Sequence, residues 1–259
     1  MDEATIVKIG GSIITDKAGG RAVVKEALLY QLARELCTHN GSLVLLYGGG
    51  AFGHPIAQRY RLPGRILDKN SLEGLRKTSA SMHLLGDAVS QAFSRRGLRV
   101  VPFQTSALFH EEKGELVCGN SQLLKSILRA GGIPLLGGDG VIADSTRIKI
   151  ASADALAVVL ARELSISRIL FATDVDGVYA TYPPHEGARP HAQLKREDIS
   201  HVALGAQKGN KHDVTGAMGG KLSALLPLKH TTVIIFNGRT PTLLKKALAG
   251  KVVGTTIVL

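Results

Sequence analysis

Cysteine is scarce in this chain. Its only two cysteines, Cys37 and Cys118, lie far apart and show no metal-ligand spacing. This excludes a disulfide framework and a CxxC zinc site, so we expect free thiols in a reducing compartment. Aromatic residues make up only 4% of the chain, which disfavours nucleic-acid binding.

Long apolar runs are also lacking. No stretch approaches the roughly 18 uncharged apolar residues of a membrane span. The first residues, MDEATIVKIGGS, have neither the basic nor the apolar segment of a signal peptide. We therefore expect a cytoplasmic protein with no membrane partner.

Acidic residues are outnumbered, with 21 Asp and Glu against 32 Lys and Arg and a net charge of +11. Clustered cations would favour nucleic-acid binding. These cations are scattered, however, and no RNA-binding or zinc-finger motif accompanies them. We interpret them as a solvated basic surface that attracts small anionic substrates, and we expect no nucleic-acid partner.

Short β-branched segments alternate with segments of helical periodicity, such as the one carrying Leu28, Leu32 and Leu36. The strand segments are continuously apolar, which is typical of strands covered on both faces. Strands are expected at residues 5–9, 42–47, 98–103, 133–137, 168–173, 232–237 and 255–259, and helices at 23–37, 71–97, 120–132 and 153–165. The alternation predicts an α/β fold, a three-layer αβα sandwich with a mainly parallel central sheet.

Two segments depart from this alternation. Residues 138–152 are typical of a short hairpin with Asp144 and Ser145 in its turn. Residues 179–231 are rich in loop-forming residues. We predict a single domain over residues 1–259, with two lobes of about 1–165 and 166–259.

Two predicted strands end in glycine clusters, KIGGS (8–12) and YGGGAFGH (47–54). Ligands of parallel sheets bind beyond the carboxyl ends of the strands. Glycine turns let backbone amides surround anionic oxygens, although tight turns can also need glycine for geometry alone. Two such turns beside Lys8 and His54 favour an anion site.

Familiar phosphate and hydrolase motifs are absent. Residues 10–15 do not match GxGxxG, and Gly220-Lys221 lacks both the first glycine and the final Ser or Thr of a P-loop. Protein-kinase and GxSxG signatures are missing as well.

Four motifs, in this order, resemble the amino-acid kinase family: KIGGSIITDK (8–17), GGGAFGHP (48–55), TDVDGVY (173–179) and DVTGAMGGK (213–221). Within the family they look like the isopentenyl phosphate kinases. The resemblance implies transfer of the γ-phosphate of ATP, with Mg²⁺, to isopentenyl phosphate. It also implies acceptor binding by the first lobe, nucleotide binding by the second, and a homodimer.

The resemblance also implies roles for single residues. Lys8 and Lys17 would stabilise the transferring phosphoryl group, and Lys221 would hold the ATP phosphates. Asp154 would orient the lysines through charge-assisted hydrogen bonds. His54 would donate a hydrogen bond to the acceptor's phosphate.

Two binding sets follow from the same resemblance. ATP contacts are expected at Lys8, Gly10, Gly11, Ser12, Gly50, Asp174, Gly177, Tyr179, Gly216 and Lys221, and acceptor contacts at Gly48, Gly49, His54 and Ala153. No protein metal ligand is assigned. By themselves, Asp174 and Asp176 would suit Mg²⁺, a ribose or a simple turn.

Some residues depart from the family pattern. Tyr47 replaces a common histidine, Ala153 a glycine, and Ala51 a serine. Fosfomycin kinase shares GGGAFGH, so a phosphonate kinase remains an alternative, as do a carboxylate kinase of the acetylglutamate type and a nucleotide-sensing or RNA-binding regulator without turnover.

An alkenyl tail requires an apolar pocket near His54. The predicted helix around residues 79–93 offers Met82, Leu85, Val89 and Phe93 at helical spacing. We hypothesise a pocket role for Met82 or Leu85, although such a stripe also suits plain core.

Overall fold

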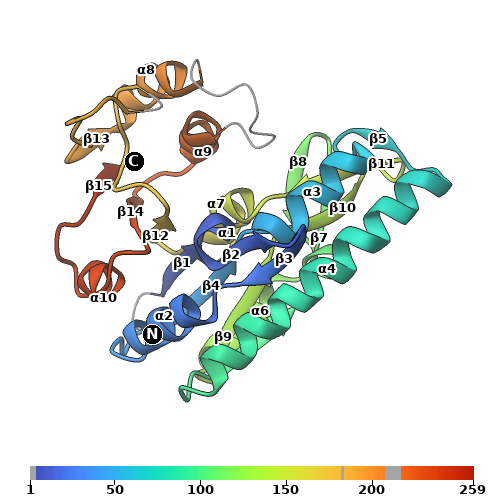
Figure 1. Cartoon of the computed structure of the whole chain (residues 1–259), viewed down its shortest axis with the longest axis horizontal. Coiled ribbons are helices and arrows are strands. Elements are labelled where there is room, and N and C mark those ends of the chain that lie inside the picture. Colours follow the sequence, from blue (N-terminus) through green and yellow to red (C-terminus); the bar gives the residue numbers. More distant parts are fainter. Residues whose placement is uncertain (1–3, 182–183, 208–216) are drawn as a thin grey trace.

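The computed structural model describes residues 4–181, 184–207 and 217–259 (Figure 1). Its main sheet has eight strands in the order β13-β15-β14-β12-β1-β4-β9-β6. Every neighbouring pair is parallel except β14 and β15. The strands are β1 (Thr5–Ile9), β4 (Leu43–Tyr47), β6 (Val100–Phe103), β9 (Ile133–Gly137), β12 (Arg168–Thr173), β13 (Gln193–Lys195), β14 (Thr232–Asn237) and β15 (Thr255–Val258).

Helices cover both faces of this sheet because its strands are apolar on both sides. On one face α2 (Glu26–Leu36), α4 (Lys69–Ser94) and α10 (Leu243–Leu248) pack against a core that includes Val7 and Ile9. On the other face α6 (Ser121–Arg129), α7 (Ala153–Glu163), α8 (Arg196–Gln207) and α9 (Ala217–Leu225) pack against a core that includes Ile6. The predicted three-layer fold is confirmed.

A smaller sheet of five strands extends the α7 side of the molecule, in the order β5-β11-β10-β7-β8. Its strands are β5 (Arg65–Ile66), β7 (Phe109–Glu112), β8 (Glu115–Cys118), β10 (Asp139–Ala143) and β11 (Arg147–Ala151). The predicted hairpin is β10–β11, and Asp144 and Ser145 take positive φ in its turn. The hairpins β2–β3 (Thr15–Ala18, Arg21–Val24) and β7–β8 were not predicted.

Three further helices complete the described elements: α1 (Gly11–Ile14), α3 (Gly50–Tyr60) and α5 (Thr105–Leu108). Helices α1 and α3 follow β1 and β4 directly, which places both glycine clusters at one edge of the main sheet. Strand β13 and helices α8 and α9 all lie in the segment predicted as loop-rich. Among the described residues, no helix is both long and apolar enough to cross a membrane.

Candidate active site

A cavity of about 710 Å³ opens where β1, β4 and β12 end. Thirteen of the predicted site residues line it: Lys8, Gly10, Gly11, Ser12, Lys17, Gly48, Gly49, Gly50, His54, Ala153, Asp154, Asp174 and Lys221. Gly177 and Tyr179 are not part of the lining, and Gly216 lies outside the described residues. One cleft therefore joins cations from distant parts of the chain.

Asp154 lies between two of the lysines that line this cavity. One carboxylate oxygen is 2.8 Å from Lys8 Nζ, and the other accepts a hydrogen bond of 2.5 Å from Lys221 Nζ. Lys8 shares a strand face with Ile6, so its side chain leaves β1 on the α7 side. Asp154 stands in the first turn of α7, where the helix dipole stabilises a carboxylate.

The charges of this triad perturb one another. Burial lowers the pKa of Lys221 to about 8, although the Asp154 carboxylate opposes this effect. Burial would raise the pKa of Asp154, but the ammonium groups of Lys221 and Lys8 hold it well below its usual range. The triad keeps one net positive charge, which suits an incoming phosphate.

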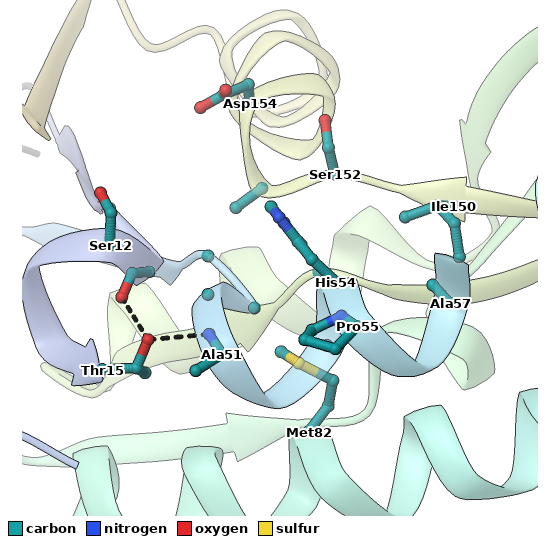
Figure 2. A pocket seen from close by; sticks show the side chains of 18 of the residues that line it. Ser12, Thr15, Ala51, His54, Pro55, Ala57, Met82, Ile150, Ser152 and Asp154 are labelled. Carbon is teal, nitrogen blue, oxygen red and sulfur yellow. Dashed lines mark hydrogen bonds between the residues drawn. The ribbon is translucent and has the colours of Figure 1, made fainter. Parts of the chain in front are cut away.

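The two glycine turns touch each other, and Thr15 joins them. Its hydroxyl donates to the Gly11 carbonyl at 2.7 Å and accepts from the Ala51 amide at 2.9 Å (Figure 2). A Cβ on Gly11 would lie 2.2 Å from the Gly50 nitrogen, so no larger residue fits there. Sequence analysis assigned no role to Thr15, although it belongs to the KIGGSIITDK motif.

His54 is the fifth residue of α3. Its imidazole projects into the cavity toward the beginning of α7, where Ser152 and Asp154 lie (Figure 2). Met82, Ala57 and Ile150 line the same cavity and give it an apolar side. Figure 2 shows the Met82 side chain reaching from α4 toward α3 near Pro55.

A pocket role was hypothesised for Met82 or Leu85, and of the four apolar residues at helical spacing on this helix only Met82 lines the cavity. Leu85, Val89 and Phe93 are fully buried in the core between α4 and the sheet. Helical spacing repeats every three to four residues, but of the α4 residues only Thr78 and Met82 line the cavity.

Lys17 lies on β2, in a hairpin that borders the cavity. The neighbouring Asp16 accepts a hydrogen bond of 2.8 Å from the Lys17 amide and pairs with Lys25 at 3.2 Å. The Lys17 side chain itself is exposed. The hairpin therefore presents an ammonium group at the mouth of the cavity.

Two residues predicted to contact ATP in the segment after β12, Gly177 and Tyr179, contact other residues of the protein. A Cβ on Gly177 would lie 2.5 Å from Thr255 Oγ1, and the Tyr179 hydroxyl donates to Asp176 at 3.4 Å. ATP contacts of Gly177 and Tyr179 stay predictions.

Further lining residues that sequence analysis did not single out are Thr15, Asp16, Gly53, Pro55, Gln58, Thr78, Gly138, Asp139, Ser152, Thr173, Val175 and Met218.

No cluster of three or more His, Cys, Asp or Glu side chains in the described part of the chain is arranged to hold a metal ion. Cations and bare amides thus dominate the cavity, together with one histidine and an apolar side. This is the chemistry of a phosphotransferase, which neutralises polyanions and needs no protein nucleophile.

Comparison with known proteins agrees with this class. Residues 3–237 match the Amino acid kinase family. The isopentenyl phosphate kinase of Methanothermobacter thermautotrophicus is 32% identical over 97% of this chain and 98% of its own length. The acetylglutamate kinase of Deinococcus radiodurans is 30% identical, covering 93% of this chain and 98% of its own.

A solved isopentenyl phosphate kinase structure is similar with a TM-score of 0.84 and 29% identity, over 98% of this chain and 100% of that one. The chain belongs to the amino acid kinase family.

Proposed function

We propose that this protein transfers the γ-phosphate of ATP to isopentenyl phosphate and so makes isopentenyl diphosphate. The observation that carries the proposal is the neighbourhood of His54. The cavity that His54 lines is bordered by both glycine turns and by Lys8, Lys17 and Lys221, and Met82, Ala57 and Ile150 add apolar surface to it. An acceptor with a phosphate head and a short hydrocarbon tail matches both kinds of surface.

The transfer itself needs little help from acids or bases. A phosphate oxygen of the acceptor attacks the γ-phosphorus, the bond to the β–γ bridging oxygen breaks, and ADP leaves with that electron pair. Lys8 and Lys17 neutralise charge on the moving phosphoryl group, and Lys221 holds the phosphates of ATP. Asp154 keeps Lys8 and Lys221 in place through its two short contacts.

In this proposal the two lobes bind different substrates. Residues 1–165 bind the acceptor through Gly48, Gly49, His54 and Ala153, and residues 166–259 bind ATP together with the first glycine turn.

Mg²⁺ is part of the proposal. It would supply charge neutralisation between the phosphate groups. Mg²⁺ in such sites is typically bound through substrate phosphates and one or two carboxylates, and Asp174 at the cavity edge fits that pattern.

A carboxylate kinase of the acetylglutamate type is the second candidate, favoured by the similarity to acetylglutamate kinase. A phosphonate kinase of the fosfomycin type is a third. Both acceptors are compact and polar, so they would leave the apolar side around Met82 unfilled.

The test is a substrate panel. Purified protein is incubated with Mg·ATP and isopentenyl phosphate, acetylglutamate or fosfomycin, and the products are identified by phosphorus NMR. We expect isopentenyl diphosphate as the main product. His54→Ala should raise the KM for the acceptor strongly, whereas Lys17→Ala should lower kcat. Preferential phosphorylation of either alternative acceptor would reject the proposal.

We further propose a homodimer in the cytoplasm. Leu84 on α4 has a side chain that is 68% exposed, and Leu72 on the same helix is 54% exposed. A second copy of the chain packed along α4 would cover them.

Both cysteines are free thiols, which suits a reducing compartment such as the cytoplasm.

A further inference from the structure

Arg239 stands at the mouth of the cavity, in the turn between β14 and α10. Its guanidinium donates a hydrogen bond of 3.3 Å to the Ser12 carbonyl in the first glycine turn. It also lies 3.9 Å from the Asp174 carboxylate. Ser12 and Asp174 both line the cavity, so this cation borders the site from a segment that none of the four family motifs includes.

The ion pair between Arg239 and Asp174 is long and solvated. Arg239 is 49% exposed and Asp174 is 44% exposed. Pairs of this kind contribute little to stability. The guanidinium can therefore exchange Asp174 for a phosphate group at small cost, and its planar donors suit phosphate oxygens.

The backbone of this turn is firmly held. The Gly238 amide donates to the Thr173 carbonyl at 2.8 Å, and the Arg239 amide donates to the Asn237 side chain at 3.0 Å. Asn237 in turn donates to Asp176 at 2.9 Å. The base of the arginine is thus fixed relative to the end of β12, which reduces the entropy lost when the side chain binds.

Glu35 holds the other end of the same turn. This carboxylate comes from α2, is only 7% exposed, and accepts from the amides of Thr242 at 2.9 Å and Lys245 at 3.1 Å. Thr242 has a φ of 70°, a conformation that costs free energy and persists only where the surrounding structure holds it. Glu35 is separated from these partners by more than 200 residues, yet both of its oxygens are used to hold this turn.

The charge of Arg239 also affects Asp16 in the β2–β3 hairpin, which borders the cavity. The pKa of Asp16 is lowered first by the hydrogen bond from the Lys17 amide, then by Lys25, and in smaller part by the charge of Arg239. The charge of the guanidinium thus acts on a carboxylate of β2 as well as on Asp174 at the end of β12, 3.9 Å away.

We propose that Arg239 is a further nucleotide-binding residue, contacting the polyphosphate of ATP at the cavity mouth, and that Glu35 is its positioning residue. This inference rests on the proposed function for ATP as the phosphate donor, but not on the identity of the acceptor.

The first experiment measures nucleotide affinity without turnover. Mg·AMP-PNP is titrated calorimetrically into the unchanged chain and into Arg239→Gln, Arg239→Lys and Lys251→Gln. Lys251 is an exposed cation beyond α10 that does not line the cavity, so its variant controls for net charge. We expect Arg239→Gln to weaken binding about tenfold, Arg239→Lys less, and Lys251→Gln by no more than about twofold.

Steady-state kinetics then separate binding from general damage. Arg239→Gln should raise the KM for ATP by a similar factor, while the KM for the acceptor stays within about twofold. Glu35→Gln should also raise the KM for ATP. The double variant should be no worse than Arg239→Gln alone, because Glu35 acts through the arginine.

Equal affinities for Arg239→Gln and Lys251→Gln would overturn the role of Arg239. A double variant whose defects multiply would overturn the positioning role of Glu35. If the unchanged chain binds Mg·AMP-PNP but does not phosphorylate isopentenyl phosphate, the proposed acceptor fails while the arginine is still tested by binding.

Discussion

Replacement of Asp154 by asparagine tests the central electrostatic arrangement of the site. The carboxylate contacts Lys8 at 2.8 Å and Lys221 at 2.5 Å, and the side chains of Lys8, Lys221 and Asp154 are only 9%, 10% and 22% exposed. The asparagine keeps the size of the side chain and removes its charge. Two ammonium groups would then share a buried site without a counter-ion, which destabilises the charged form of each.

The size of the expected change in the pKa of Lys221 follows from Coulomb's law. Unit charges 4 Å apart interact by about 4 kcal/mol at an effective dielectric constant of 20. Halving this for partial solvent access gives roughly 2 kcal/mol, or about 1.5 pH units. The pKa of Lys221, already lowered by burial to about 8, would then fall to between roughly 6 and 7.

The sign of the pH effect is fixed by the role of the lysine. Lys221 must carry its proton to bind phosphate, so kcat/KM for ATP, which reports the free enzyme, falls as pH rises through this pKa. The unchanged enzyme should lose kcat/KM near pH 8, and Asp154→Asn should lose it at a lower pH. At a pH of about 7.5, ionisation alone should reduce kcat/KM about eightfold.

The assay is a pH profile of kcat/KM for ATP between about pH 6 and pH 9.5, a range that spans both expected pKa values. Asp87→Asn removes a carboxylate from an exposed position on α4 and serves as the matched control. An alkaline limb at the same pH in Asp154→Asn and in the unchanged enzyme would refute the account of how Asp154 and Lys221 interact.

Two further changes test the walls of the cavity. Thr15→Val removes the hydroxyl between the Gly11 carbonyl and the Ala51 amide, so we expect both KM values to rise and the free energy of unfolding to fall by about 1–2 kcal/mol, measured by urea denaturation. Unchanged KM values would show that this hydroxyl does not hold the glycine turns in position. Met82→Ala enlarges the apolar side near His54, so isoprenoid phosphates with longer tails should gain in kcat/KM relative to isopentenyl phosphate. Leu85→Ala, which alters the core outside the cavity, is the control, and the same chain-length preference in all three enzymes would discard the pocket.

Sequence patterns predicted the elements that rest on continuous or periodic burial. The strands of the main sheet at 5–9, 133–137, 168–173 and 232–237 have the predicted bounds. The β10–β11 hairpin could be predicted because Asp144 and Ser145 accept the positive φ of its turn. The ends of helices were predicted less accurately. The helix predicted over 71–97 spans Lys69–Ser94, because its N-cap Asp68 precedes the apolar periodicity.

The missed elements lack such a pattern. In β2, three of the four residues are exposed, so TDKA gives no alternation to detect. Strand β13 and helices α8 and α9 were missed because residues 179–231 as a whole are rich in loop-forming residues.

By itself, the sequence determined the layered fold and the presence of two glycine turns at strand ends, because burial and backbone geometry depend on local residue types. It also supplied Lys8, His54 and Lys221 as candidates. Only the tertiary structure decided that Asp154 lies between Lys8 and Lys221, that Thr15 joins the two turns, and that Arg239 reaches Ser12 across 227 positions. Contacts of this kind depend on how α7, α9 and the turn after β14 dock on the sheet, and no local pattern records that docking.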